Sequence, residues 1–476
     1  MTVRSLTIPA PSLRTYNDHI EKLRLSEFPL LNDSNPSVRA GARIDHIRER
    51  ALRFFNADPE HFDLVFLANA TAAVKLVANA FQDASSDKNP SNFWFGWHYD
   101  AHTSLVGVRE LTDGNHECFY SDQQVQKWIE AGAHIQKGSL GLFAYPGQSN
   151  MTGRRLPLSW PGQIRRAQTR RDELQKVYTL LDAAALATTT PIDLSDPSNA
   201  PDFTCLSFYK IFGFPDLGAL IVRKSSSHIL CQRKYFGGGT VEMVISLSPT
   251  WHAKKSDNLH DACEDGTLPF HSILALGHAL DVHRELFGSM QIVSAHTSHL
   301  VRTLYDSLLD LRHYNSRALC RFYNEPSATY GDPSTQGATL ALNILRPDGS
   351  LVGYTDVQHA ANELNVYVRS GSLCNPGGMA TYLGWSPEEM RAAYGKGHRC
   401  DNPIQIIEGK ATGVVRCSFG ASSTLSDVYR FVEFMRDTYM RHSSKVKGMI
   451  EDATSCRPNM KISECGDEDV EKMKGS

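Results

Sequence analysis

A carboxylate and an amine follow two neighbouring apolar segments in the middle of the sequence. Asp182 comes directly after Val177–Leu181, and Lys210 comes three residues after Phe203–Ser207. If both segments are strands of one sheet, the two polar side chains reach the same crevice at the carboxyl edge of that sheet. Pyridoxal 5'-phosphate needs this pair, because a lysine forms a Schiff base with its aldehyde and a carboxylate keeps its pyridine nitrogen protonated. On these residues alone, a turn-capping Asp182 and a solvated Lys210 remain an alternative.

A phosphate group needs N–H donors and hydroxyls, and the start of a helix supplies them. The tripeptide Asn69–Ala70–Thr71 stands between a predicted strand and a predicted helix. It is therefore the candidate phosphate site.

Cys374 is the candidate nucleophile. It stands in Arg-Ser-Gly-Ser-Leu-Cys-Asn-Pro-Gly-Gly, residues 369–378, whose glycines and proline predict a loop. We expect a mobile loop that brings the thiol to a bound substrate. Because the thiolate is the reactive form, a nearby base is expected as well. An inert buried cysteine is the alternative, and the neighbouring Asn-Pro-Gly-Gly disfavours it.

Short apolar runs alternate with helical patterns over the first part of the chain. The predicted strands are Asp63–Leu67, Asn92–Phe95, Leu140–Ala144, Val177–Leu181, Phe203–Ser207 and Gly218–Val222. Helical spacing is seen in Ala70–Phe81 and Pro161–Lys176. Strands that are apolar on both faces and alternate with helices predict an α/β domain with a mostly parallel sheet covered by helices.

The pattern changes after residue 270. Two helices are predicted at Phe270–Phe287 and Ser294–Leu311, and an alternating strand at Ala338–Leu345. The apolar pieces Val366–Val368 and Val414–Phe419 follow, and then a helix that starts with a capping box of Thr424 and Asp427 and has a stripe of Val428, Phe431, Val432 and Met435. We therefore expect an N-terminal arm (1–35), a large domain (36–285), a smaller α+β domain (286–442) and a disordered polar tail (443–476).

Composition excludes several classes of protein. The 476 residues carry a net charge of −3, so no strong basic field exists for nucleic acid or an anionic membrane. The ten cysteines are scattered with no C-x-x-C pair, which disfavours a zinc module or a disulfide framework. No signal-type leader and no long apolar run are present, so a cytoplasmic protein is expected.

Several blocks in a fixed order resemble one family. They are FFNADPEHFDLVFLANATAAVKLV, HYDAHTSLVGVRE, YPGQSN, DAAA, SFYKIFG, the Gly237–Gly239 run, EDGTLPF, RSGSLCNPGG and GHRC. Together they resemble the class V aminotransferase superfamily, and within it the cysteine-desulfurase-like domain of molybdenum cofactor sulfurases. The resemblance runs from about Glu27 to Met440. It implies a PLP-dependent transferase of fold type I.

The resemblance also implies roles in binding pyridoxal 5'-phosphate. Lys210 is the covalent lysine, Asp182 pairs with the ring nitrogen, and His102 stacks on the ring. The remaining cofactor ligands are Asn150 at the ring hydroxyl, Ala70, Thr71 and Ser207 at the phosphate, and Thr267 at the phosphate of a neighbouring subunit. Thr267 thus implies a homodimer, with a plain turn residue as the alternative. No metal is expected, because His98 and His102 have no third ligand in view.

For the substrate, the resemblance implies that Cys374 takes sulfur from L-cysteine, which leaves alanine and a persulfide. Arg416 clamps the substrate carboxylate, and Arg369 is a further substrate-binding residue. A sulfur-acceptor protein or cofactor is the implied partner. Two alternatives stay open: a PLP-dependent lyase, aminotransferase or epimerase acting on another amino acid, and a catalytically impaired, cofactor-free relative.

Four departures from the family bear on these expectations. A Tyr-Leu-Asp-His-Ala-Gly block has no counterpart where Glu27–Leu31 runs into Asn32–Pro36. It normally lines the substrate side of the site, which is the basis for the impaired alternative. Tyr209 stands where many desulfurases have histidine, and Met379 near a position where sulfurases often have cysteine. The half of the sulfurases that binds the molybdenum cofactor also has no counterpart.

Overall fold

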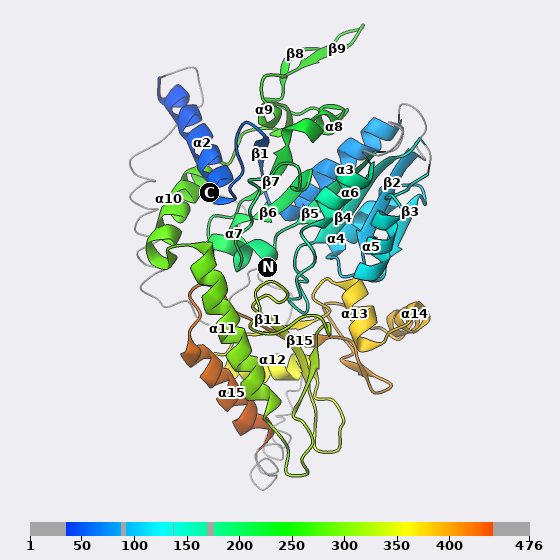
Figure 1. Ribbon diagram of the computed structural model, residues 1–476, viewed down its shortest axis with the longest axis vertical. Helices are drawn as coiled ribbons and strands as arrows, with labels where there is room; N and C mark the ends of the chain where they lie inside the picture. The colour runs from blue at the N-terminus through cyan, green and yellow to red at the C-terminus, as the bar shows by residue number, and fades with distance from the viewer. Residues whose placement is uncertain (1–34, 87–91, 137, 169–175, 441–476) are drawn as a thin grey trace, which may run out of the picture.

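Seven strands form a large sheet in the order β1-β7-β6-β5-β4-β2-β3 (Figure 1). The computed structural model describes residues 35–86, 92–136, 138–168 and 176–440. The strands are β1 Phe62–Leu67, β2 Phe93–His98, β3 His116–Phe119, β4 Leu140–Pro146, β5 Lys176–Asp182, β6 Phe203–Ser207 and β7 Gly218–Arg223. Strands β2 to β6 pair in parallel, and only β7 runs antiparallel to both of its neighbours. The predicted mostly parallel sheet is confirmed.

Both faces of this sheet are covered because successive side chains of its strands point to opposite sides. In β4, Phe143 and Tyr145 join one buried cluster, and Leu142 and Ala144 join the other. The helices that cover the sheet and flank its strands are α2 Asn35–Phe54, α3 Ala70–Ser86, α4 Thr103–Val106, α5 Asp122–Glu130, α6 Trp160–Gln168, α7 Phe208–Phe212, α8 His228–Cys231, α9 Leu259–Cys263 and α10 Phe270–Phe287.

A second, antiparallel sheet of four strands lies beside the first, in the order β10-β11-β15-β12. Its strands are β10 Cys320–Tyr323, β11 Thr339–Ile344, β12 Arg369–Gly371 and β15 Val414–Ser418. The helices of this part are α11 Met290–Leu309, α12 Tyr354–Glu363, α13 Pro376–Leu383, α14 Pro387–Gly395 and α15 Leu425–Tyr439. The capping box of Thr424 and Asp427 opens α15 as predicted, and all four residues of its expected stripe are buried.

Two local predictions differ from the structure. Helix α6 ends at Gln168 and Lys176 already belongs to β5, so the predicted helix to Lys176 is too long; residues 169–175 lie outside the described ones. Strand β11 is buried on both faces because its residues contribute to two clusters, so the predicted alternation is wrong. Strand β12 follows directly after Val366–Val368. Lys210 lies in the one-turn helix α7, which Gly213 ends at φ 80°.

Several elements were not predicted, and two of them shape the molecule. Helix α2 begins at Asn35 and packs against α10. A hairpin of β8 Val241–Ile245 and β9 Trp251–Lys254 projects beyond the large sheet (Figure 1). The predicted boundary between 285 and 286 stays a prediction. Residues 1–34 and the predicted tail 443–476 lie outside the described residues. Among the helices that the structure describes, none has the length and apolar character needed to cross a membrane.

Candidate active site

Lys210, Asp182 and His102 share one electrostatic environment at the carboxyl edge of the large sheet. Burial lowers the pKa of the Lys210 amine; the Asp182 carboxylate opposes this shift, and the Arg416 guanidinium adds to it. Burial likewise lowers the pKa of His102, again against the opposing charge of Asp182 and with the like charge of Lys210. Asp182 itself is buried at the end of β5 and accepts a hydrogen bond from the Ala184 amide at 3.0 Å. The structure therefore brings the predicted lysine, carboxylate and imidazole together.

The ring of His102 is fixed by its own backbone neighbourhood. Its Nδ1 accepts a hydrogen bond from the Ser104 amide at 3.1 Å, which caps helix α4. An amide N–H is only a donor, so Nδ1 is unprotonated and the ring hydrogen of the neutral form sits on Nε2. The lowered pKa agrees with this neutral ring.

The start of helix α3 has the geometry of an anion site. The Ala70 amide donates to Ser207 Oγ at 3.1 Å, and the Ala72 amide donates to Asn69 Oδ1 at 3.0 Å. Among the described residues, the exposed Thr71 offers an amide with no acceptor. The first strand residue of β7 must be glycine here, because a Cβ at Gly218 would lie 2.4 Å from the Asn69 Cα. The predicted residues Ala70, Thr71 and Ser207 thus meet at one helix N-terminus.

Cys374 is exposed, as predicted, and it lies in a hydrogen-bonded turn rather than in a long loop. Leu373 and Cys374 both have positive φ (58° and 55°), and the Asn375 amide donates to the Ser372 carbonyl at 3.1 Å. These two residues are therefore the corner of a tight turn. The Pro-Gly-Gly run that predicted a loop instead opens helix α13, with the Asn375 side chain as its N-cap.

Contacts from the large domain hold this turn in place. The Thr103 amide donates to the Cys374 carbonyl at 2.9 Å, and Asn150 Nδ2 donates to the Leu373 carbonyl at 2.6 Å. Because Thr103 follows His102, the thiol and the imidazole stand on adjoining segments. The sequence did not reveal these hydrogen bonds, because the partners of the turn lie far away along the chain. The mobility of Cys374 stays a prediction.

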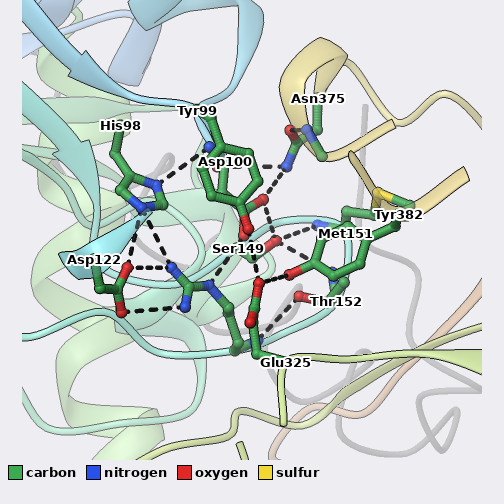
Figure 2. A network of polar contacts seen from close by, with 12 residues as sticks. His98, Tyr99, Asp100, Asp122, Ser149, Met151, Thr152, Glu325, Asn375 and Tyr382 are labelled. Atoms are coloured by element: carbon green, nitrogen blue, oxygen red, sulfur yellow. Dashed lines mark hydrogen bonds and ion pairs between the residues drawn. The ribbon is translucent and has the colours of Figure 1, made fainter. Parts of the chain in front are cut away.

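Figure 2 shows the buried polar network behind this turn. Asp100 is fully buried and accepts from Asn375 Nδ2 at 2.6 Å and from Ser149 Oγ at 2.7 Å. Arg154 bridges Asp100 at 3.3 Å and Asp122 at 2.6 Å. Burial raises the pKa of Asp100, and the Arg154 charge opposes that shift. These residues were not identified from sequence, although Asp100 and Asn375 lie inside two of the blocks quoted above.

Arg416 is a cation with no anion beside it among the described residues. Its Nη1 donates to the Asn150 carbonyl at 2.6 Å, while its buried Nε has no partner. Burial, with a further contribution from the like charge of Arg369, lowers the pKa of Arg416 to about 10. Arg369 pairs with Arg416 across strands β12 and β15 and is more exposed. A partly buried guanidinium of this kind is a receptor for a carboxylate.

Two predicted cofactor ligands are placed differently from the rest. The Asn150 side chain bonds the Leu373 carbonyl and accepts from Asn375 Nδ2 at 3.1 Å, so it already serves the Cys374 turn. Thr267 is exposed on the loop after α9, away from the hydrogen bonds that join the other residues. The carboxylate of Glu264, three residues before Thr267, forms an ion pair with the Arg48 guanidinium at 2.6 Å. The cofactor roles of Asn150 and Thr267 stay predictions.

The donor set fits pyridoxal 5'-phosphate on three structural grounds. A helix N-terminus with a spare amide suits the phosphate, Asp182 suits a protonated ring nitrogen, and the lowered pKa of Lys210 suits reaction with an aldehyde. Within the described ranges, no three His, Cys, Asp or Glu side chains gather as metal ligands do.

The fold and this site define a class. The chain belongs to the aminotransferase class-V family, whose model matches residues 29–431. A cysteine desulfurase from Thermococcus onnurineus NA1 superposes with a TM-score of 0.66 at 17% identity, covering 91% of this chain and 92% of that chain. A cysteine desulfurase from Escherichia coli gives 0.63 at 19% identity, covering 89% and 91%. These structures share the fold type I architecture, which confirms the predicted fold class.

Within this class the chain is similar to proteins named molybdenum cofactor sulfurase. The one from Aspergillus niger is 50% identical over 417 residues, which are 88% of this chain and 50% of the relative. A relative from Aspergillus fumigatus is 51% identical over 418 residues, covering 88% and 49%. The chain therefore spans about half the length of the curated relatives it matches.

Proposed function

We propose that the protein is a PLP-dependent cysteine desulfurase-type sulfurtransferase, which converts L-cysteine to alanine and leaves a persulfide on Cys374. One observation carries the proposal: the turn of the exposed Cys374 is hydrogen-bonded to Thr103, next to His102, whose ring shares the electrostatic environment of Lys210 and Asp182. The two solved structures described above are cysteine desulfurases, and the relatives that are about 50% identical are named molybdenum cofactor sulfurase.

Pyridoxal 5'-phosphate is the cofactor in this proposal, and it supplies an electron sink that labilises bonds at the substrate α-carbon. Lys210 would hold the cofactor through its aldehyde, and Asp182 would pair with the ring nitrogen. Ser207, Ala70 and Thr71 at the start of helix α3 would hold the phosphate. His102 would face the ring as a neutral imidazole.

Arg416 binds and orients the substrate carboxylate. Nη1 is already fixed by the Asn150 carbonyl, so the remaining N–H groups of the guanidinium are preset for the ligand. A carboxylate bound to Arg416 would neutralise its positive charge, which Lys210 and Arg369 otherwise repel.

Cys374 Sγ would then bond to the substrate sulfur while the bond from that sulfur to the substrate β-carbon breaks. The carbon keeps the bonding electrons and takes up the proton that the Cys374 thiol gave up, which yields alanine. The turn presents this thiol without a search through loop conformations, because the backbone on both sides of it is hydrogen-bonded to the large domain. Sulfur passes onward to an acceptor protein or cofactor.

The finer features of this proposal are a homodimer and a cytoplasmic location. The exposed hairpin β8–β9 joins the Thr267 loop through the Gly266 amide, which donates to the Gly238 carbonyl at 2.7 Å. This contact supports the proposal that the hairpin and the Thr267 loop form one surface that binds a second copy of the chain. The eight described cysteines are free thiols, which is typical of a reducing compartment.

The test is alanine formation from L-cysteine by the purified chain together with its visible spectrum. Cys374→Ala should lower alanine formation by at least about 100-fold and keep the bound cofactor, because the variant removes only the nucleophile. Lys210→Ala should lose the covalently bound cofactor. Cys231→Ala, at an exposed cysteine on α8, is the matched control and should behave as the parent.

Alanine formation by Cys374→Ala at the parent rate would exclude the sulfur-transfer role. A panel of other amino acids tests the lyase and aminotransferase alternative, which predicts turnover of one of them in place of L-cysteine. A chain that binds no cofactor would support the impaired relative.

A further inference from the structure

A second exposed cysteine lies next to the turn that carries Cys374. Cys400 Sγ is 3.8 Å from the hydroxyl of Ser372, the first residue of that turn. Two steps of chain separate Ser372 from Cys374 and span at most about 7 Å between Cα atoms. Cys400 therefore lies beside the turn that carries Cys374, although 26 positions separate the two cysteines in the sequence.

The segment that carries Cys400 is tied down as well. It follows helix α14, where the Arg399 amide donates to the Asn402 carbonyl at 3.3 Å and the Ile404 amide donates to His398 Nδ1 at 3.2 Å. Arg399 also lies over the ring of Tyr394, 3.5 Å from its centroid. Cys400 is thus held at the surface beside the Cys374 turn.

The other described cysteines are poorer neighbours for Cys374. Cys205, Cys263, Cys320 and Cys417 are buried, and Cys118 is half-buried. Cys231 is exposed on α8, which Figure 1 places beside the large sheet, whereas α13 and α14 lie below it. Among the exposed cysteines that the structure describes, Cys400 is the one that contacts the Cys374 turn, through the Ser372 hydroxyl.

We propose that Cys400 is a second sulfur-carrying site that takes the persulfide sulfur from Cys374; this step rests on the proposed function. The Cys400 thiolate attacks the outer sulfur of the Cys374 persulfide. A bond forms between Cys400 Sγ and that sulfur, and the bond from that sulfur to Cys374 Sγ breaks. Cys374 leaves as a thiolate and takes up the proton that Cys400 gave up, so no oxidant or reductant is consumed.

The consequence is a division of labour between the two thiols. Cys374 is returned to the state that accepts sulfur from a new substrate molecule, and Cys400 holds the first sulfur on the outer surface. An acceptor can then collect sulfur without reaching the substrate pocket.

The test maps persulfides by alkylation and peptide mass spectrometry after the full chain has reacted with L-cysteine without reductant. The parent should store about two sulfane sulfurs per chain and Cys400→Ser about one, since one carrier is lost. Cys374→Ser should carry none on Cys400, and Cys231→Ser should match the parent. A persulfide confined to Cys374 in the parent, or one on Cys400 in Cys374→Ser, overturns the proposal.

Treatment with the thiol oxidant diamide tests the geometry without substrate or cofactor. A disulfide-linked peptide pair of Cys374 and Cys400 should form in the parent and in Cys231→Ser, because a disulfide needs Cα atoms only about 4–7 Å apart. Absence of this pair while both thiols react with iodoacetamide overturns the relay. A linked pair without alanine formation rejects the proposed function, and the relay falls with it. Alanine formation without sulfur on Cys400 rejects the relay alone.

Discussion

Lys210 illustrates how single charges decide the chemistry of the site. Its amine is removed from water and is influenced by the charges of the Asp182 carboxylate and the Arg416 guanidinium. Burial and Arg416 both favour the neutral amine, and Asp182 favours the ammonium. The net lowering of the pKa makes the amine a better nucleophile than an exposed lysine at the same pH.

These opposing charges predict opposite pH shifts in two variants. The neutral fraction of an amine rises as the pH rises through its pKa, so a lower pKa moves the reaction with an aldehyde to lower pH. Asp182→Asn removes the charge that favours the ammonium and should move the curve down by about one pH unit. Arg416→Gln removes repulsion and should move it up by a similar amount.

The measurement is borohydride trapping of added pyridoxal 5'-phosphate on the Lys210 peptide across a pH series. The midpoint of each curve is compared rather than its height, since both variants also change binding of the probe. Midpoints that shift in the same direction would contradict the assigned roles of the two charges.

At the scale of elements, hydrogen bonds join the Cys374 turn and the start of helix α13 to the segment that follows β2. Asn375 joins two tasks: its Oδ1 caps helix α13 through the Gly378 amide at 2.8 Å, and its Nδ2 donates to buried Asp100. Gly377 permits close contact here, because a Cβ at that position would lie 2.0 Å from the Tyr99 carbonyl oxygen. The element that carries the nucleophile is therefore positioned by the segment that also carries His102.

Asn375→Ala should lower both stability and turnover. It leaves Asp100 short of a donor in a buried site, which costs about 1–3 kcal/mol of unfolding free energy. Because Arg416 and Lys210 are untouched, kcat for alanine formation should fall with little change in KM. Asn375→Asp keeps an oxygen for the cap but faces Asp100 with a like charge, so it should not rescue turnover.

Ser386→Ala provides the control for a simple loss of capping. Ser386 caps helix α14 in the same way and has no contact with Asp100 among the hydrogen bonds of the described residues. It should lose about 1 kcal/mol of stability and keep full kcat. Equal loss of kcat in the Ser386 and Asn375 variants would mean that stability, not positioning, is responsible.

The same elements show what sequence predicts and why it stops. Strands such as Phe203–Ser207 and helix Phe270–Phe287 were predicted to the residue, because apolar patterning and local caps define them. The hydrogen bonds that hold the Cys374 turn were missed because their partners are far apart in the sequence. Asn375 and Asp100 are 275 positions apart, and Asn150 and Leu373 are 223 apart. Hairpin β8–β9 was missed because its apolar residues are exposed, so burial imposes no alternation on them.

At the scale of the whole molecule, residues from both sheets and their flanking segments make up the candidate site. Lys210, Asp182 and His102 belong to the part with the seven-stranded sheet, and Arg416 and Cys374 to the part with the four-stranded sheet. Family resemblance predicted a shared site for these residues, because it carries long-range information that local patterns lack. It does not say which surface binds a second chain. The exposed β8–β9 hairpin is the candidate for that surface.

The β8–β9 hairpin exposes more apolar surface than an isolated hairpin tolerates. Leu247 is 80% exposed and Trp251 is 53% exposed, and Met243, Val244 and Ile245 are exposed beside them. A lone two-stranded hairpin is marginally stable in water, and a cluster of this kind marks an interaction surface. In the proposed dimer a second copy covers it, and the linked loop brings Thr267 to the phosphate of that copy.

The double variant Leu247→Ser with Trp251→Ser should therefore sediment as a monomer where the parent sediments as a dimer. It should also release pyridoxal 5'-phosphate faster on dialysis, because the partner's hydroxyl is lost from each phosphate site. Thr267→Ala should stay dimeric and show only the faster release, which separates assembly from ligation. Tyr120→Ser, at a side chain that is 69% exposed elsewhere, controls for the loss of a surface aromatic and should change neither property. A parent chain that sediments as a monomer while it forms alanine would rule out the shared site and make Thr267 an ordinary turn residue.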